Sequence, residues 1–182
     1  MMKRIYLTLV AIVTLISGAF AQAKIGFVNS EYILKHIPEY AAAQKQIDDL
    51  SNQWKGESDL KFDEIDKLYK AFQAEQVLLT DEMHKRREQE IADKEKAAKD
   101  FQRQKFGYDG ELFQRRKELV KPIQDKVYTA VQKVAEEGGF GILFDKSSEL
   151  IMLYSSPKLD KSDAVITKLG LKPGELQGEN KK

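Results

Sequence analysis

Hydrophobic residues in the stretch 39–120 recur at intervals of three and four residues, or multiples of these. This spacing places them on one face of a helix. The pattern is interrupted once, at 78–82, where Thr80 is a residue type that starts helices well. The pattern therefore predicts two helices, 39–78 and 81–120, joined by a turn.

The two predicted helices are equal in length, 40 residues each. At 1.5 Å per residue, each would be roughly 60 Å long, so we expect them to fold back as an antiparallel hairpin. Polar residues such as Ser58, Gln76, Lys94 and Lys105 interrupt both apolar stripes, which predicts an incompletely filled seam. The apolar seam positions are Ile47, Leu50, Trp54, Phe62, Ile65, Tyr69, Phe72 and Leu79 in the first helix, and Met83, Ile91, Ala98, Phe101, Tyr108, Leu112 and Leu119 in the second.

The segments on either side of the hairpin predict a small body that contains strands. Residues 24–29 are rich in strand formers, and the apolar runs 140–145 and 150–154 are spaced as a β-hairpin. Ser30 is expected to cap a short helix, and Pro122 is expected to mark the exit from the long hairpin. The short predicted helices are 31–36, 122–136 and 163–169, with Gly138 and Gly139 ending the second and Gly170 the third.

The first residues are typical of a secretory signal peptide. A basic start precedes the apolar run 5–16, and Ala19-Phe20-Ala21 is a small-x-small cleavage site. The run is too short for a membrane span of about 20 residues, so we expect an exported protein cleaved after Ala21. Removing Lys3 and Arg4 leaves 28 basic and 29 acidic residues, a near-neutral balance that does not indicate nucleic-acid binding.

The chain is therefore predicted to be α+β and mainly α, with a long antiparallel helical hairpin on a small β-body. With few strands and no cysteine for a disulfide, the body has a small core, and open strand edges favour association with other copies. The predicted parts are a signal peptide at 1–21, a body at 22–38 and 121–170, a hairpin arm at 39–120, and a disordered tail at 171–182.

Four segments toward the two ends of the chain form an ordered pattern. They are Lys24-Ile25-Gly26-Phe27-Val28-Asn29, Val120-Lys121-Pro122-Ile123, the run from Gly138 to Asp145, and Tyr154 followed by Asp160-Lys161-Ser162. Read together, they resemble the Skp (OmpH-like) periplasmic chaperones over roughly 24–169. Two features depart from the family pattern: Lys161 stands where an aliphatic residue is usual, and better-known members are strongly basic.

The resemblance implies a jellyfish-like homotrimer in which strands from three chains form the body. Three hairpin arms would surround a cavity in the periplasm. The implied activity is that of an ATP-independent holdase, which binds unfolded outer-membrane β-barrel proteins in this cavity and prevents their aggregation.

Apolar residues off the predicted seam are the candidate contacts to an unfolded client. They are Leu60, Leu68, Phe106 and Phe113. Many weak contacts of this kind would hold a client and still release it. The alternative is that these side chains complete the packing of the hairpin, for example Phe106 against Trp54.

A cluster of cations at the start of the second helix is a candidate contact to an anionic lipid or lipopolysaccharide. It consists of Lys85, Arg86 and Arg87. The first arm, 39–78, has five basic and nine acidic residues, whereas the second, 81–120, has eleven and ten. The alternative is a solvated helix face whose cations pair with acidic neighbours, namely Glu82, Glu88 and Glu90.

Three glycines interrupt good helix formers and are candidate hinge positions: Gly56, Gly107 and Gly110. Each lowers helix stability by roughly 1 kcal/mol relative to alanine. Antiparallel register brings them to a similar level, where the arms could splay. The alternative is that Gly107 and Gly110 permit close approach of the helices.

The sequence favours a binding protein over an enzyme. It has two histidines and no cysteine, and His84 with Glu88 is more typical of a surface pair than of a metal site. The glycines at 138–141 follow a helix, the reverse of a phosphate-binding loop, so no cofactor or metal is predicted. The main alternative function is an exported structural or adaptor coiled coil, for which a continuous Leu- and Ile-rich seam is expected.

Overall fold

The computed structural model describes residues 23–148 and 152–174. They form two compact units. The hairpin unit is Ile37–Asp125, and the body unit contains the described residues of 1–36 and 126–182. The predicted signal peptide, and most of the predicted tail, lie outside the described residues.

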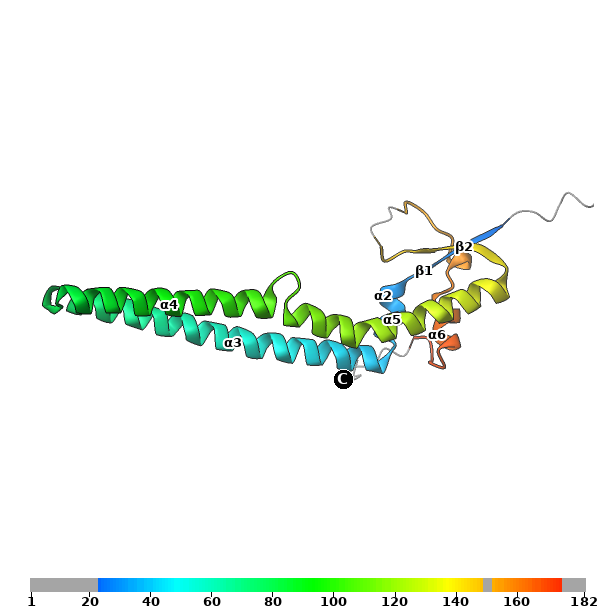
Figure 1. The fold of residues 1–182 in the computed structure, drawn as a ribbon. Helices are drawn as coiled ribbons and strands as arrows, with labels where there is room; N and C mark the ends of the chain where they lie inside the picture. Colours follow the sequence, from blue (N-terminus) through cyan, green and yellow to red (C-terminus); the bar gives the residue numbers. More distant parts are fainter. Residues whose placement is uncertain (1–22, 149–151, 175–182) are drawn as a thin grey trace, which may run out of the picture. The chain divides into compact units, whose positions relative to one another are not determined.

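The hairpin unit confirms the predicted antiparallel pair of helices. Helix α3 (Pro38–Glu75) leads through the 3₁₀ turn η1 (Gln76–Leu78) into α4 (Asp81–Phe106), which returns along α3 (Figure 1). Helix α5 (Glu111–Gly138) begins in this unit and continues beyond it. The fold is mainly helical, as the hydrophobic spacing predicts.

The turn between α3 and α4 forms where the sequence predicts it. The Thr80 hydroxyl accepts a hydrogen bond from the Met83 amide at 3.3 Å, and the Thr80 carbonyl accepts one from the His84 amide at 2.8 Å. Asp81 and Glu82 lie in the first turn, where negative charge favours the positive end of the helix dipole.

The second predicted helix is not continuous. It divides at 107–110 into α4 and α5, and Gly107 leaves the helical conformation with ψ 171°. A Cβ on Gly107 would lie 2.3 Å from the Arg103 carbonyl oxygen, and one on Gly110 would lie 2.8 Å from the Gly107 nitrogen. Only glycine fits both positions without a shift, so these residues form a local break. Pro122 lies inside α5.

The body unit contains a two-stranded parallel sheet. Strand β1 (Lys24–Val28) pairs with β2 (Phe140–Asp145), with Phe27 opposite Phe144. The predicted β-hairpin partner at 150–154 is not observed: 150 and 151 lie outside the described residues, and 152–154 form no strand. Parallel strands need a long crossover, and here the chain between β1 and β2 contains the whole helical hairpin.

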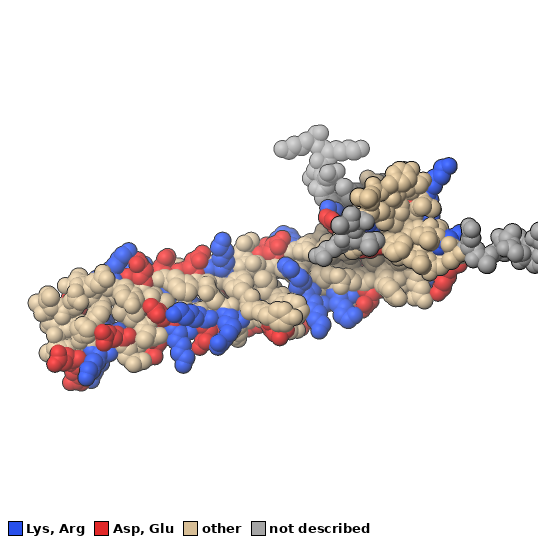
Figure 2. Space-filling model, turned by 90° about the horizontal axis from the view of Figure 1, so that it is seen from above, with Lys and Arg blue, Asp and Glu red and all other residues tan. Residues whose placement is uncertain are grey.

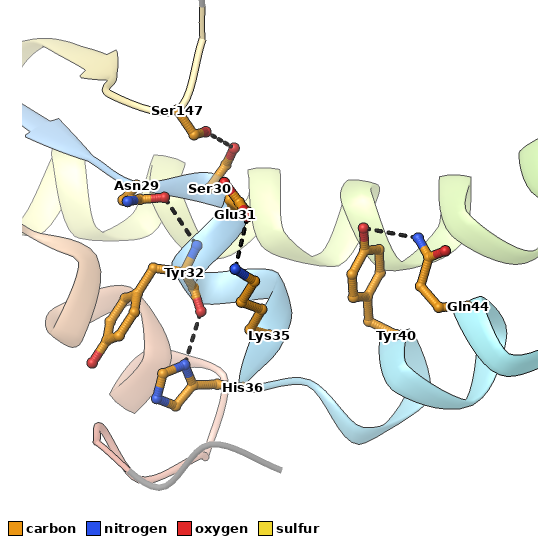
Figure 3. Close-up of polar contacts among 9 residues, drawn as sticks. All are labelled: Asn29, Ser30, Glu31, Tyr32, Lys35, His36, Tyr40, Gln44 and Ser147. Carbon is orange, nitrogen blue, oxygen red and sulfur yellow. Dashed lines mark hydrogen bonds and ion pairs between the residues drawn. The ribbon is translucent and has the colours of Figure 1, made fainter. Parts of the chain in front are cut away.

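The first body helix, α2 (Ser30–Lys35), is capped by Asn29 and not by Ser30 as predicted. The Asn29 side chain accepts a hydrogen bond from the Tyr32 amide at 2.9 Å (Figure 3). The Ser30 hydroxyl instead donates to Asp145 at 2.6 Å and lies 2.6 Å from the Ser147 hydroxyl. Asn29 can cap the helix in place of serine, because its short side chain also reaches the free backbone amides of the first helical turn.

The glycine ends predicted for two helices are confirmed, whereas the helix end predicted at Pro122 is wrong: a proline removes one donor, but α5 continues through it to Gly138. Gly139 and Gly170 have positive φ, 66° and 80°, after α5 and α6 (Ser162–Lys168). Asp160 accepts hydrogen bonds from both the amide and the hydroxyl of Ser162 at the start of α6. A short 3₁₀ helix, η2 (Pro157–Leu159), precedes it.

The body core joins α2 and α6. Ile33, Val165 and Ile166 are fully buried. His36 is buried as well, and both of its ring nitrogens have partners: Nδ1 lies 2.8 Å from the Tyr32 carbonyl oxygen, and Nε2 lies 3.2 Å from the Gly174 amide. Figure 3 shows the first of these contacts at the end of α2.

Asp145 ties the end of β2 to the start of α2. Its carboxylate accepts hydrogen bonds from the amides of Ser30 and Ser147, each at 3.0 Å, and from both hydroxyls. Burial by itself raises the pKa of Asp145, but these hydrogen bonds outweigh burial and hold the pKa below its ordinary value.

We predict that Asp145→Asn lowers the free energy of unfolding by about 1 kcal/mol at pH 7, since an amide can accept fewer of these bonds. The pKa is lower in the folded chain, so the wild-type contribution is complete above about pH 4 and is lost as the pH falls through the folded value. Urea unfolding at pH 7, 5 and 3, followed by circular dichroism, should show the difference from wild type shrinking on acidification. A constant difference, or an equal loss in the exposed control Asp48→Asn, would contradict this.

Candidate functional site

Large apolar side chains are exposed along the hairpin unit, and they form its most prominent candidate site. Among them, Phe62, Tyr69, Met83 and Tyr108 were predicted to fill the seam. That prediction is wrong for these four, since Tyr69 is 45% exposed and Tyr108 is 91% exposed. The buried seam residues are few, because small or polar side chains occupy neighbouring positions. The exposed large apolar residues are Leu60, Phe62, Tyr69, Val77, Leu78, Met83, Phe106, Tyr108 and Phe113.

Polar contacts take the place of apolar packing at several points of the seam. Buried Ser58 accepts a hydrogen bond from Gln102 at 3.1 Å across the two helices. Lys94 reaches Glu64 at 2.7 Å, and this hydrogen bond raises the pKa of Lys94 and lowers that of Glu64. Both groups are solvent-exposed, so the pair positions the helices more than it stabilises them.

The four predicted client contacts have different surroundings. Leu60 is 70% exposed and Leu68 is half-buried, both on α3. Phe106 meets Trp54 edge to face with ring centroids 6.4 Å apart, the contact named in the packing alternative, and is still 39% exposed. Phe113 stacks on the nearly fully exposed Tyr108, with centroids 6.2 Å apart. The structure pairs these aromatics locally and does not gather all four candidates in one place.

Lys105 is the residue that the sequence interpretation missed. It was taken as a polar interruption of the seam, but its ammonium lies 4.7 Å from the Trp54 ring centroid, 5.8 Å from that of Phe101 and 2.5 Å from the Glu111 carboxylate. Glu111 also accepts a hydrogen bond from Gln104 at 2.9 Å. These contacts bridge the break at 107–110. The signal that could have revealed them is Trp54 at the matching height of the opposite helix.

The three candidate hinge glycines have two kinds of environment. Gly107 and Gly110 form the break between α4 and α5, where a Cβ would clash. Gly56 lies within α3, and a Cβ there would have no atom within 4 Å. Gly56 is two residues from Trp54, which contacts Lys105, so the break and the weak point of α3 lie at a similar level.

The candidate cation cluster is largely paired with acidic neighbours. Arg86 lies 3.0 Å from Glu82, and Arg87 lies 3.1 Å from Glu90, as the alternative interpretation predicts. Lys85 is exposed and takes part in no ion pair within the described part of the chain. Figure 2 shows positive and negative side chains interspersed along the hairpin.

The described residues contain no cluster of possible metal ligands. Within 23–148 and 152–174, no three His, Cys, Asp or Glu side chains are grouped as metal ligands would be. Over the same residues, no helix combines the length and the apolar character needed to cross a bilayer. The chemistry that the surface does offer is a series of separate apolar and charged contacts.

Comparison with known proteins gives a consistent result. A family model for OmpH-like outer membrane proteins matches residues 24–169. A solved structure from Caulobacter crescentus, of a candidate outer membrane chaperone of the OmpH-like type, has a TM-score of 0.63 and 17% identity, covering 82% of this chain and 85% of that one. At this identity the likeness shows a common fold. No curated protein matches the chain.

Proposed function

Because the chain belongs to the family of OmpH-like outer membrane proteins, we propose that it is an ATP-independent holdase chaperone. In this proposal it works in the periplasm and binds unfolded outer-membrane β-barrel proteins. The observation that supports it best is the exposure of large apolar side chains along a hairpin whose helices are otherwise fully formed. Each of these side chains can remove apolar surface from water when an unfolded polypeptide lies against it.

The separation of these side chains suits a holdase. Leu60, Tyr69 and Phe113 are each exposed but belong to different parts of the hairpin. Several contacts of about 1 kcal/mol each would sum to firm binding, while each breaks quickly. A client held in this way needs no nucleotide for its release.

The body unit supports the proposal of a homotrimer. A two-stranded sheet is only marginally stable by itself. Its apolar residues Ile25, Ile142 and Phe144 are exposed in the single chain. We propose that three copies cover these side chains, so that the three hairpins surround one cavity.

An exported structural coiled coil without a client remains the alternative. Such a protein would be expected to have a continuous apolar seam. Ser58 and Lys105 occupy seam positions here, and Tyr69 is exposed, all of which favour the chaperone.

We also propose that the hairpin bends at the level of Gly56 and the break at 107–110. Within the break the Gly110 amide donates a turn hydrogen bond to the Gly107 carbonyl at 2.9 Å, and Lys105 and Gln104 reach across it to Glu111. Opening these contacts would let the arm adapt to clients of different size.

A contact between the turn of the hairpin and an anionic lipid or lipopolysaccharide is a further proposal. Lys85 is exposed, and Arg86 and Arg87 are held only by exposed ion pairs. Val77 and Leu78, which the sequence analysis placed at the end of the first helix, are exposed close by in the chain. Cations beside apolar side chains are typical of interfacial binding.

The holdase proposal predicts that residues 22–182 suppress the aggregation of a urea-unfolded outer-membrane β-barrel diluted into them without nucleotide. Light scattering measures the suppression, and molar mass from in-line scattering should correspond to one client per trimer. Leu60→Ser with Phe113→Ser should weaken suppression about twofold or more, whereas the exposed polar control Gln73→Ser should not. Undiminished aggregation by a well-folded oligomer would favour the structural alternative.

The bending proposal predicts opposite effects of two substitutions. Gly56→Ala should stiffen α3, because Ala is favoured by roughly 1 kcal/mol and meets no neighbour. Glu111→Gln should make the break at 107–110 more mobile, because it removes the carboxylate that pairs with Lys105. The chain has no cysteine, so spin labels can be placed on Lys96→Cys and Lys117→Cys. Mixing the labelled protein with an excess of unlabelled protein leaves one labelled pair per oligomer, and the distribution of its distance should narrow in the first variant and broaden in the second. Equal widths in wild type and both variants would rule out bending there.

The lipid proposal predicts that reversing Lys85, Arg86 and Arg87 to Glu weakens sedimentation with phosphatidylglycerol vesicles. Each cation near an anionic surface contributes about 1 kcal/mol, so the loss should exceed tenfold at low salt. The matched control reverses three lysines of α3, namely Lys45, Lys55 and Lys67. An unchanged affinity, or an equal loss in the control, would show that the cluster is not a lipid site.

A further inference from the structure

A groove between α3 and α4 combines an apolar floor with an acidic rim. Its volume is about 370 Å³. The four α4 residues that line it are spaced i, i+3, i+4 and i+7, and so share one face of the helix. The lining residues are Tyr69 and Phe72 from α3, and Glu88, Ile91, Ala92 and Glu95 from α4.

The floor is apolar because of three of these residues. Ile91 is buried in the seam, and Phe72 is half-buried and meets the His84 ring edge to face at 4.7 Å. Tyr69 is 45% exposed, so much of its side chain remains accessible. The side chain of Ala92 is only a methyl group, so α4 leaves the groove unfilled at this position.

The rim carries negative charge that is only weakly compensated. Glu88 and Glu95 are seven residues apart on α4, about 10 Å along the helix. Their own partners, His84 and Lys99, are each 3.5 Å away in exposed contacts. Exposed pairs of this length contribute little and exchange readily with another cation. The first arm, 39–78, adds a formal net charge of −4.

We infer that this groove binds an arginine or lysine side chain of an unfolded polypeptide. The aliphatic stem lies over the floor at Ile91 and Ala92, and the cationic head reaches the aromatic rings and the two carboxylates. Arginine is favoured over lysine, because its planar guanidinium both stacks on rings and donates paired hydrogen bonds to carboxylates. The inference rests on the proposed holdase function. It implies that the hairpin arms, although nearly neutral overall, prefer clients that contain cationic segments.

Two unstructured fluorescent peptides of equal length test the inference. One alternates arginine with leucine, and in the other every arginine is replaced by glutamine. Anisotropy with residues 22–182 should show that the arginine peptide binds about fivefold or more tightly, an advantage that high salt removes. Equal affinities for the two peptides would overturn the inference.

Matched variants locate the binding. Glu88→Gln with Glu95→Gln should remove most of the arginine advantage, whereas the control Glu82→Gln with Glu90→Gln, an equal change of charge on the same helix, should keep it. Ala92→Leu fills the groove with a residue that favours helix, and it should lower the affinity for the arginine peptide about fivefold. Ala97→Leu, which lies outside the groove, should leave this affinity unchanged. An equal loss in the control variants would show that the attraction is not local to the groove.

Suppression of β-barrel aggregation is measured on the same samples. If wild type suppresses aggregation but the groove variants bind both peptides as wild type does, the groove inference fails and the holdase function stands. If wild type neither suppresses aggregation nor binds either peptide, both fail.

Discussion

Packing of α3 against α4 along a narrow seam is the interaction on which the rest of the hairpin depends. Trp54, Ile65, Ile91 and Ala98 are buried there, and they are too few to bury both helices along their length. Two helices alone can hide only one stripe each, so every further large apolar residue is left at the surface. The exposed side chains proposed to bind clients are thus a direct consequence of using two helices instead of four.

The same constraint explains why the seam contains polar contacts. Lys105 places its ammonium near the rings of Trp54 and Phe101 and beside the Glu111 carboxylate. A leucine there could fill the seam but could not connect the end of α4 to the start of α5 through a carboxylate. The seam thereby gains a contact that can open and close without exposing a large apolar surface. This combination suits the bending that we propose for the arm.

The local signals in the sequence predicted most of the fold, because they depend on near neighbours. The helical spacing, the cap at Thr80 and the glycines at 139 and 170 are determined within one turn of chain. The pairing of β1 with β2 was not predicted, since it joins residues more than a hundred positions apart. The break at 107–110 was also missed, although Gly107 and Gly110 were recognised, because helix spacing continues in register across it. Lys105 and the groove at Ala92 depend on which residues of two helices face each other, which spacing on one helix cannot decide.

Charge is the property that separates this chain from a general apolar binder. The first arm is acidic and the second nearly neutral, so opposite charges alternate along the hairpin and no single sign dominates its surface. Long-range attraction of clients by a uniform field is therefore weak at physiological salt, where it is screened beyond about 8 Å. Selectivity must then come from short-range sites at which a carboxylate lies beside an apolar or aromatic side chain. The groove at Tyr69, Glu88 and Glu95 has this composition. In our proposal it binds a single arginine or lysine side chain of the client, so the client as a whole need not be charged.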